Sequence, residues 1–257
     1  MRQPFSEPNA SISAAIDIWR IDLNWDSSKV SQSIKNLSPD EEEKARSFRF
    51  EKDRDRYIVA RNSLRIIIGN YLDIKPDQIR FSYNKYGKPF LDNGNQELRF
   101  NLSHSRDIAL IAVTSGAEVG VDVEYLDDEL DVMTLANTIL SETETSMLEK
   151  LPADSQTKTF FKAWTRKEAF LKALGKGFSE TADRLPTSAL MTEAKISVKI
   201  TGGQSDKSWW LASFPINRDY SAAVAAEGDI GTIRYKKFSN GSKENATRLP
   251  ENTTLYT

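Results

Sequence analysis

The fold of this 257-residue chain can be approached from one strand-like stretch, Val119-Gly120-Val121-Asp122-Val123-Glu124. Because side chains alternate along a strand, the three valines face one side, and Asp122 and Glu124 face the other. The two carboxylates then lie roughly 6.5 Å apart along the strand. If both are ionised, they repel by about 2–3 kcal/mol at an effective dielectric constant of 20. Water at a half-solvated edge strand, a basic side chain or a cation can offset this repulsion.

A second stretch, FFKAWTRKEAFLKALGKG at residues 160–177, predicts an amphipathic helix that ends at Gly175. One face carries Phe161, Trp164, Glu168 and Leu171, so a carboxylate lies within an apolar stripe. Glu168 can instead form a surface pair with Lys172 at i, i+4. Carboxylates without Cys or neighbouring His would select Mg²⁺, or Mn²⁺, over zinc.

The same reading extends to both halves of the chain. Strand patterns are found at residues 15–23, 79–83, 98–102, 108–113, 119–124, 196–200, 209–213 and 221–225. Helix patterns follow Ser38, which begins a capping box closed by Glu41, continue over residues 57–71, and return from about 130 to 174. In each half, one strand is therefore followed by helices and then by further strands. We predict an α+β fold with a pseudo-twofold pair of similar lobes, residues 1–117 and 118–238, a cleft between them and a loose polar tail over 239–257.

The composition excludes several classes of protein. The chain has no cysteine and one histidine, which excludes a disulfide scaffold, the usual zinc sites and cysteine nucleophiles. A net charge of -2 argues against general nucleic-acid binding. The longest apolar run, residues 108–113, is far shorter than the roughly 20 residues of a membrane span. The first residues lack the apolar core of a secretory signal, so we expect a cytoplasmic protein.

Charge is strongly segregated along the chain. Residues 46–65 hold seven Lys or Arg against three acids, whereas residues 107–149 hold eleven acids and no basic residue. Basic residues return between Lys158 and Lys176. Such blocks are typical of solvated surface, or of a site that holds a metal ion beside a polyanionic ligand.

Two further motifs are weak by themselves. Phe100-Asn101-Leu102-Ser103-His104-Ser105 ends an alternating strand. Adjacent Ser103 and His104 point to opposite sides of it, so they are not a nucleophile and its base. Tyr86-Gly87-Lys88-Pro89 reads as an ordinary turn.

Together, in this order, the four motifs YGKP, FNLSHS, VGVDVE and FFKAWTRKEAFLKALGKG resemble the 4′-phosphopantetheinyl transferases of the surfactin-synthetase-activating type. The resemblance covers roughly residues 35–225. It implies a pair of α+β lobes and an enzyme that moves phosphopantetheine from coenzyme A to a serine of an acyl or peptidyl carrier protein, leaving 3′,5′-ADP. Because the attacking hydroxyl comes from the carrier, the chain itself needs no nucleophile.

The resemblance also implies a role for individual residues. It makes Asp122, Glu124 and Glu168 the Mg²⁺ ligands. The residues that it assigns to coenzyme A are Ser103, His104 and Arg56 at the 3′-phosphate, Gly87, Lys88 and Pro89 at the adenine, and Lys44 and Lys172 at the phosphates.

Two glutamates are less certain in role. Glu144 lies where the family often has a general base, but Ser141-Glu142-Thr143-Glu144 is also a good capping box. Some relatives carry a phosphate-facing Lys at the position of Glu41. The contact with coenzyme A is therefore expected to be weaker there or to be made by other residues.

Two rival functions remain open at this stage. A coenzyme A or nucleotide-binding module could keep the fold without catalysis, although binding alone would not need Asp122, Glu124 and Glu168 together. A Mg²⁺-dependent phosphohydrolase would release free phosphopantetheine instead of modifying a protein. We expect a monomer with neither a nucleic acid nor a membrane as partner.

Overall fold

The computed structural model describes residues 14–92, 97–175, 185–186, 191, 196–200 and 207–239. Its strands form two four-stranded sheets and a small hairpin. The first sheet has the order β10-β1-β5-β4, from β1 (Ala14–Asp22), β4 (Leu98–Ser105), β5 (Ile108–Ser115) and β10 (Ile230–Lys237). The second has the order β6-β9-β8-β7, from β6 (Val119–Tyr125), β7 (Ile196–Ile200), β8 (Lys207–Ser213) and β9 (Tyr220–Glu227). The hairpin pairs β2 (Phe81–Tyr83) with β3 (Pro89–Leu91).

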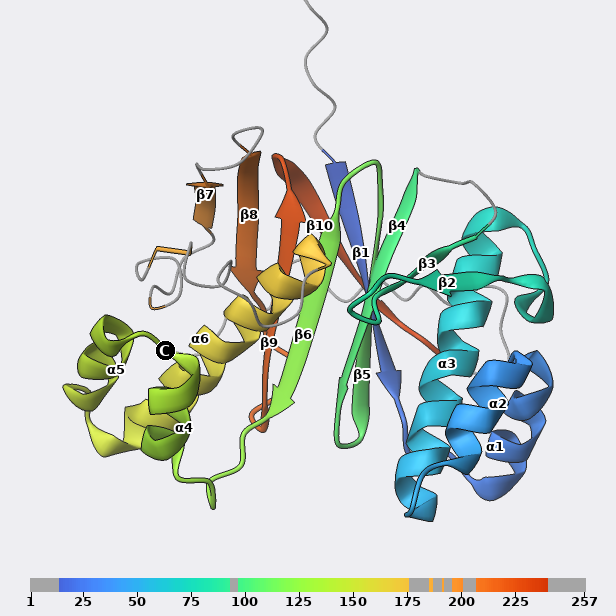
Figure 1. Ribbon diagram of the computed structural model, residues 1–257, viewed down its shortest axis with the longest axis horizontal. Coiled ribbons are helices and arrows are strands. Elements are labelled where there is room, and N and C mark those ends of the chain that lie inside the picture. Colours follow the sequence, from blue (N-terminus) through green and yellow to red (C-terminus); the bar gives the residue numbers. More distant parts are fainter. Residues whose placement is uncertain are drawn as a thin grey trace, which may run out of the picture.

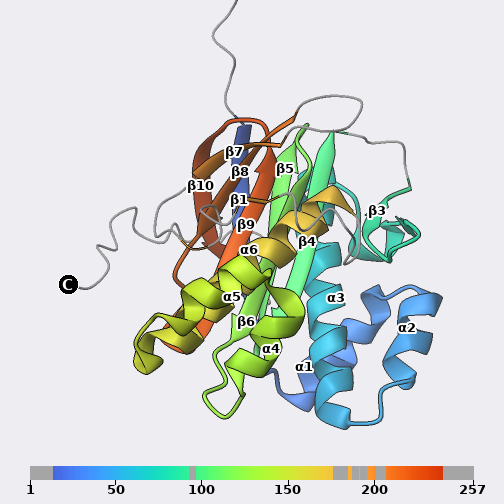
Figure 2. The same cartoon turned by 60° about the vertical axis from the view of Figure 1, so that its left-hand side comes forward.

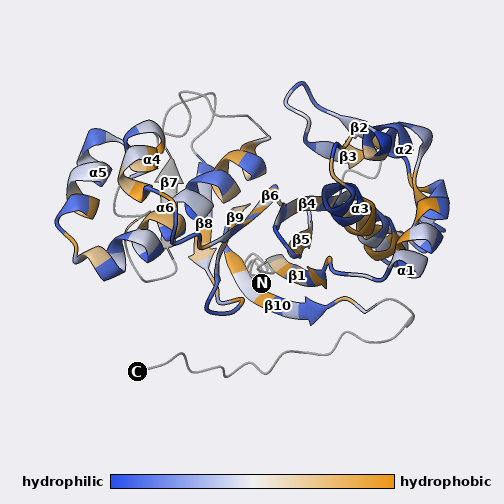
Figure 3. Cartoon of the chain, turned by 90° about the horizontal axis from the view of Figure 1, so that it is seen from below, coloured by the Kyte–Doolittle hydropathy of each residue, from blue (hydrophilic) through white to orange (hydrophobic). Residues whose placement is uncertain are grey.

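Helices flank the strands on both sides, as Figures 1 and 3 show. The first half supplies α1 (Ser27–Ser33), the 3-10 turn η1 (Ile34–Asn36), α2 (Pro39–Arg46), α3 (Glu51–Leu72) and a second turn η2 (Pro76–Gln78). The second half supplies α4 (Val132–Ile139), α5 (Glu142–Glu149) and α6 (Ala153–Leu174). None of the helices in the described part of the chain combines the length and apolar character that crossing a membrane requires.

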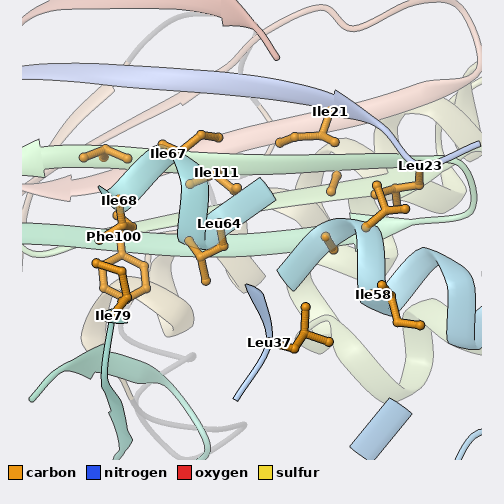
Figure 4. Packing of buried hydrophobic residues seen from close by; sticks show 14 of the residues in the cluster. Ile21, Leu23, Leu37, Ile58, Leu64, Ile67, Ile68, Ile79, Phe100 and Ile111 are labelled. Atoms are coloured by element: carbon orange, nitrogen blue, oxygen red, sulfur yellow. The ribbon is translucent and has the colours of Figure 1, made fainter. Parts of the chain in front are cut away.

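Each half buries one long helix against its own sheet. In the first, Leu64, Ile67 and Ile68 of α3 pack on Phe100 of β4 and Ile111 of β5, as Figure 4 shows. In the second, apolar residues of α6 pack on β8 and β9. Two helix–sheet layers of this kind are the expected way to cover one face of each sheet.

A third apolar core joins the two halves. Val119, Val121 and Val123 of β6 are fully buried in it, together with Ile16 and Ile18 of β1 and further apolar residues of β5, β8 and β9. The valine face of β6 therefore lies inside the molecule, and Gly120, Asp122 and Glu124 lie on the other face, toward α6. The alternation predicted for this strand is confirmed.

The structure confirms an α+β architecture and several local signals. The Ser38–Glu41 capping box is present at the start of α2, and Gly175 ends α6 with a φ of 65°. One strand departs from the expected grouping: residues 230–237, placed in the second lobe by the sequence, form β10, which pairs in parallel with β1 of the first sheet. The lobe boundary near residue 117 stays a prediction, and all but the first residue of the predicted tail lies outside the described residues.

Candidate active site

Asp122 lies at the centre of the polar face of β6. It is 1% exposed, and its Oδ1 accepts hydrogen bonds from Ser103 Oγ at 2.9 Å and from Lys172 Nζ. Its Oδ2 is buried and has no hydrogen-bond partner among the described residues. A buried carboxylate oxygen left in this state is costly, so its presence points to a ligand that the oxygen serves.

Glu124 follows two residues later on the same face. Its Oε2 accepts a hydrogen bond from Ser105 Oγ at 3.0 Å. Burial, followed by the negative charge of Asp122, raises the pKa of Glu124 to about 7. At neutral pH the Glu124 carboxyl is therefore only partly ionised, and a nearby positive charge would favour the ionised form.

Glu168 approaches this pair from α6. It is partly buried, and burial raises its pKa; the negative charge of Asp122 adds to the effect, and Lys172 opposes it. The Lys172 ammonium turns to Asp122 and lies 2.9 Å from Ser103 Oγ. Lys172 therefore contacts Asp122 of β6 in this structure. A surface pair with Glu168 does not account for the position of the Lys172 ammonium.

The three carboxylates form a candidate site for a cation. Within the described ranges, no three side chains of His, Cys, Asp or Glu are already gathered tightly enough to hold a metal ion. The chemistry of the donors nevertheless fits a hard divalent cation. Asp122 offers an unpartnered buried oxygen, and burial, with a further contribution from the charge of Asp122, raises the pKa of both Glu124 and Glu168. A cation among these oxygens would relieve that repulsion.

Ser103 and His104 point in opposite directions, as their positions in a strand require. Ser103 is buried against Asp122, whereas His104 is exposed. Although part of the side chain is exposed, the protein around the ring still desolvates it. This desolvation, followed by the positive charges of Lys172 and Arg56, lowers the pKa of His104. An anion beside this ring would reverse the effect of those two charges.

Arg56 reaches the same region from α3. Its guanidinium donates to Asp107 Oδ1, from Nη2 at 2.6 Å and from Nε at 3.1 Å, and to Asp53 Oδ1 at 3.4 Å. Asp107 follows β4 in the turn to β5, close to His104 in sequence. The structure thus brings Arg56, His104 and Lys172 to one border of the acidic group.

The turn before β3 lies at the other border. Gly87 has a φ of 83°, so glycine suits the tight turn there. Lys88 Nζ donates to Glu118 Oε2 at 3.1 Å and to the Ala173 carbonyl oxygen at 3.0 Å, and this turn is thereby tied to the end of α6. Lys88 and Pro89 line a cavity of about 570 Å³ between the two halves of the chain.

The remaining predicted residues lie apart from the carboxylates. Lys44 is exposed on α2, with its ammonium 5.6 Å from the centre of the Phe48 ring. Glu144 is buried as the third residue of α5, where its Oε2 accepts from the Ser141 amide at 2.8 Å. The capping alternative for Glu144 is therefore confirmed, and its role as a general base stays a prediction.

Glu41 has an unexpected environment. It is 1% exposed, and its two carboxylate oxygens accept from Arg61 Nε and Arg65 Nε, each at 2.6 Å. A lysine at this position would face two buried guanidinium groups. Glu41 is thus an internal partner of α3 in this chain, and the effect of this residue on the contact with coenzyme A stays a prediction.

Two residues of the site were missed from the sequence. Ser105 binds Glu124, and Asn101 Oδ1 accepts from the Val121 amide at 2.9 Å. The available signal was the polar alternation of residues 101, 103 and 105 along one strand. The motif FNLSHS drew attention to Ser103 and His104 only.

Comparison with known proteins agrees with this arrangement. Residues 118–225 match the 4′-phosphopantetheinyl transferase superfamily, and residues 24–116 match the N-terminal region of 4′-phosphopantetheinyl transferases. The 4′-phosphopantetheinyl transferase HetI of Nostoc sp. is 36% identical over 225 residues, which cover 86% of this chain and 92% of that protein. The 4′-phosphopantetheinyl transferase Sfp of Bacillus subtilis is 29% identical over 206 residues, 78% of this chain and 89% of its own length.

A more distant similarity extends to animals. The L-aminoadipate-semialdehyde dehydrogenase-phosphopantetheinyl transferase of Xenopus laevis is 24% identical over 226 residues, which cover 82% of this chain and 74% of that protein. Matches over both halves, together with the acidic strand, its helix and the cavity beside them, lead to one conclusion. The chain belongs to the 4′-phosphopantetheinyl transferase family.

Proposed function

We propose that this chain transfers 4′-phosphopantetheine from coenzyme A to a serine of an acyl or peptidyl carrier protein, releases 3′,5′-ADP and depends on Mg²⁺. Membership of the family supports the reaction and both substrates. The observation that supports the metal is the unpartnered, buried Oδ2 of Asp122. Burial, with a further contribution from the charge of Asp122, also raises the pKa values of Glu124 and Glu168. Mn²⁺ has the same preference for oxygen ligands and can substitute.

In this proposal Asp122, Glu124 and Glu168 hold the cation. When bound, the cation supplies positive charge to the pyrophosphate of coenzyme A and to the leaving phosphate. The carrier serine oxygen forms a bond to the phosphorus that bears the pantetheine, and the bond from that phosphorus to 3′,5′-ADP breaks. Glu144 remains the general base that the resemblance implies for the serine proton, provided that its carboxylate leaves the helix cap.

The basic residues bind the coenzyme. Lys172 adds charge at the acidic strand, where it already lies beside Asp122 and Ser103. Coenzyme A carries a 3′-phosphate, for which His104 and Arg56 offer charge-assisted hydrogen bonds at the border of the site.

The other assignments to the coenzyme follow the resemblance and the cavity. Lys88 and Pro89 line the cavity proposed for the adenine, and Gly87 shapes the turn that carries them. The roles of Ser103 and Lys44 toward the phosphates stay predictions. So do the surfactin-synthetase-activating subtype, the identity of the carrier, the monomeric state and the cytoplasmic location.

Mass spectrometry of an apo carrier protein incubated with coenzyme A and Mg²⁺ tests the proposed reaction. We expect the carrier to gain the mass of phosphopantetheine and 3′,5′-ADP to appear, and we expect EDTA to stop both. Free phosphopantetheine without modified carrier would indicate a phosphohydrolase. Unchanged coenzyme A would indicate a binding module.

Glu168→Gln tests the metal assignment, because it keeps the volume of the side chain and removes its charge. We expect a folded protein that has lost most transfer activity and the thermal stabilisation given by Mg²⁺ with coenzyme A. Glu129→Gln, at an exposed carboxylate after β6, is the matched control and should retain both. Near-normal turnover and retained stabilisation in Glu168→Gln would overturn the three-carboxylate site.

A further inference from the structure

The acidic strand β6 is an edge strand, and its neighbour across the molecule is another edge strand. β6 ends the second sheet and β4 ends the first, and the two lie in contact without being paired in either sheet. Figures 2 and 3 both show β4 and β6 side by side. Because neither sheet's backbone ladder joins them, side chains must fix their relative position.

Three alternate side chains of β4 do this. Asn101 Oδ1 accepts from the Val121 amide at 2.9 Å, and Ser103 Oγ donates to Asp122 Oδ1 at 2.9 Å. Ser105 Oγ makes two bonds, which are donation to Glu124 Oε2 at 3.0 Å and acceptance from the Tyr125 amide at 3.1 Å. The period of two along β4 therefore matches successive positions of β6, and each bond ends on or beside an acidic residue.

Ser105 differs from Asn101 and Ser103 because it contacts both a carboxylate and a backbone amide of β6. A serine hydroxyl has one proton to donate and lone pairs to accept. Since the Tyr125 amide occupies a lone pair, the hydroxyl proton is free for the Glu124 carboxylate. Ser105 thus joins the backbone at the end of β6 to the carboxylate of Glu124, and the rotamer of that carboxylate is fixed relative to its own strand.

We infer that Ser105 is a positioning residue, which orients the Glu124 carboxylate toward the cation of the proposed reaction. The inference rests on the proposed function, in which Glu124 is a ligand. Residues that hydrogen-bond a metal ligand set its orientation, and their loss commonly lowers metal affinity or activity by roughly 10- to 100-fold. Ser103 cannot replace this contact, because its hydroxyl is shared between Asp122 and Lys172.

A Mg²⁺ titration of Ser105→Ala and Ser105→Thr tests the inference. In Ser105→Ala we expect the Mg²⁺ concentration for half-maximal transfer to rise roughly 10- to 100-fold. The Mg²⁺ concentration needed for thermal stabilisation in the presence of coenzyme A should rise in parallel. Ser105→Thr keeps a hydroxyl and should restore both values to near those of the parent protein.

Thr114→Val is the matched control for a purely structural effect. Thr114 is also a buried hydroxyl of the first sheet, and its Oγ1 donates to the Ala15 carbonyl oxygen at 3.0 Å, away from the carboxylates. We expect Thr114→Val to lower the melting temperature without ligand while leaving the Mg²⁺ requirement unchanged. If Ser105→Ala behaves in the same way, Ser105 is merely structural and the inference is wrong.

Glu124→Gln separates the inference from the function on which it rests. Full transfer and an unchanged Mg²⁺ requirement in Glu124→Gln would overturn Glu124 as a ligand, and with it the proposed site. A loss of transfer in Glu124→Gln together with an unchanged Mg²⁺ requirement in Ser105→Ala would overturn only the role of Ser105.

Discussion

The two oxygens of Asp122 have opposite surroundings. One receives two hydrogen bonds, from a serine and a lysine, and the other is buried with none from the described residues. Burying a carboxylate oxygen without a donor costs free energy, and the folded chain tolerates this only if the group is used or otherwise compensated. This asymmetry makes Oδ2 the oxygen of Asp122 that is available to the proposed cation.

Glu144 can be assigned by a single change at this scale. Glu144→Gln keeps the capping box, because an amide can also accept from the Ser141 amide. We expect this variant to retain its melting temperature but to lose most transfer, because an amide cannot take the serine proton, whereas Glu144→Ala should also lose about 0.5–2 kcal/mol of stability with the cap. Carrier modification and thermal melting measure the two quantities. A folded Glu144→Gln protein with a normal transfer rate would instead show that Glu144 is only a helix cap.

Sequence reasoning was reliable where one residue's role follows from its neighbours along the chain. The alternation of Val119, Val121 and Val123 with Asp122 and Glu124 predicts which face is buried, because a strand has a period of two. It did not identify the partners of Glu41, which are Arg61 and Arg65 on α3. The capping box was visible locally, but the pairing of α2 with α3 was not.

At the scale of elements, the position of Glu168 depends on how closely α6 approaches β6. A Cβ atom at Gly120 would lie 2.1 Å from the Ala169 carbonyl oxygen and 2.3 Å from the Ala173 amide nitrogen. Only glycine permits this contact between strand and helix backbones. The site's third carboxylate is therefore held in place by a residue that has no side chain.

Gly120→Ala should push α6 away from β6. We expect a loss of stability of about 1–3 kcal/mol, typical of overpacking, and a rise in the Mg²⁺ concentration needed for transfer, because Glu168 moves with the helix. Gly228→Ala is the control, since its Cβ would meet nothing within 4 Å although its φ of 88° strains any other residue. It should lose stability without changing the Mg²⁺ requirement. An unchanged requirement in Gly120→Ala would show that the close packing does not position Glu168.

The elements themselves were largely predictable, although α1, β3 and β10 were not, and β10 is the most informative of these. The strands β6, β8 and β9 and the helix α6 carry strong apolar periodicity, and the structure confirms them. β10 was missed because its sequence, IGTIRYKK, is polar at an exposed edge. Its partner β1 begins at Ala14, which pairs with Ile230 far along the chain. No local pattern reports a parallel pairing over that distance.

At the scale of the whole molecule, β10, the last strand of the described residues, lies beside β1, the first. The two sheets already share the core formed by β1, β5, β6, β8 and β9. β10 then adds a second link, because it follows β9 of the second sheet and pairs with β1 of the first. The halves are therefore joined both by apolar burial and by chain connectivity.

The Asp17 carboxylate of β1 binds β10 through hydrogen bonds from charged side chains. The buried carboxylate accepts from Arg234, from Lys236 Nζ at 2.6 Å and from the hydroxyl of Tyr71. Burial opposes ionisation of Asp17, but these hydrogen bonds outweigh it and lower its pKa below 3.8. A carboxyl with a lowered pKa in the folded state stabilises the fold above the unfolded-state pKa. That contribution is lost as the pH falls through the folded-state pKa.

Asp17→Asn should therefore destabilise the protein in a manner that depends on pH. Near pH 7 we expect the free energy of unfolding to fall by about 1.5–3 kcal/mol, the range for hydrogen bonds to charged groups. Below pH 3.8 the difference from the parent should shrink, because the parent's Asp17 becomes protonated as well. Denaturant unfolding at several pH values measures both. Asp22→Asn, at an exposed position of the same strand, is the control and should change stability little at any pH. A deficit in Asp17→Asn that stays constant into acid would show that neutral packing, and not the charge of Asp17, keeps β10 on β1.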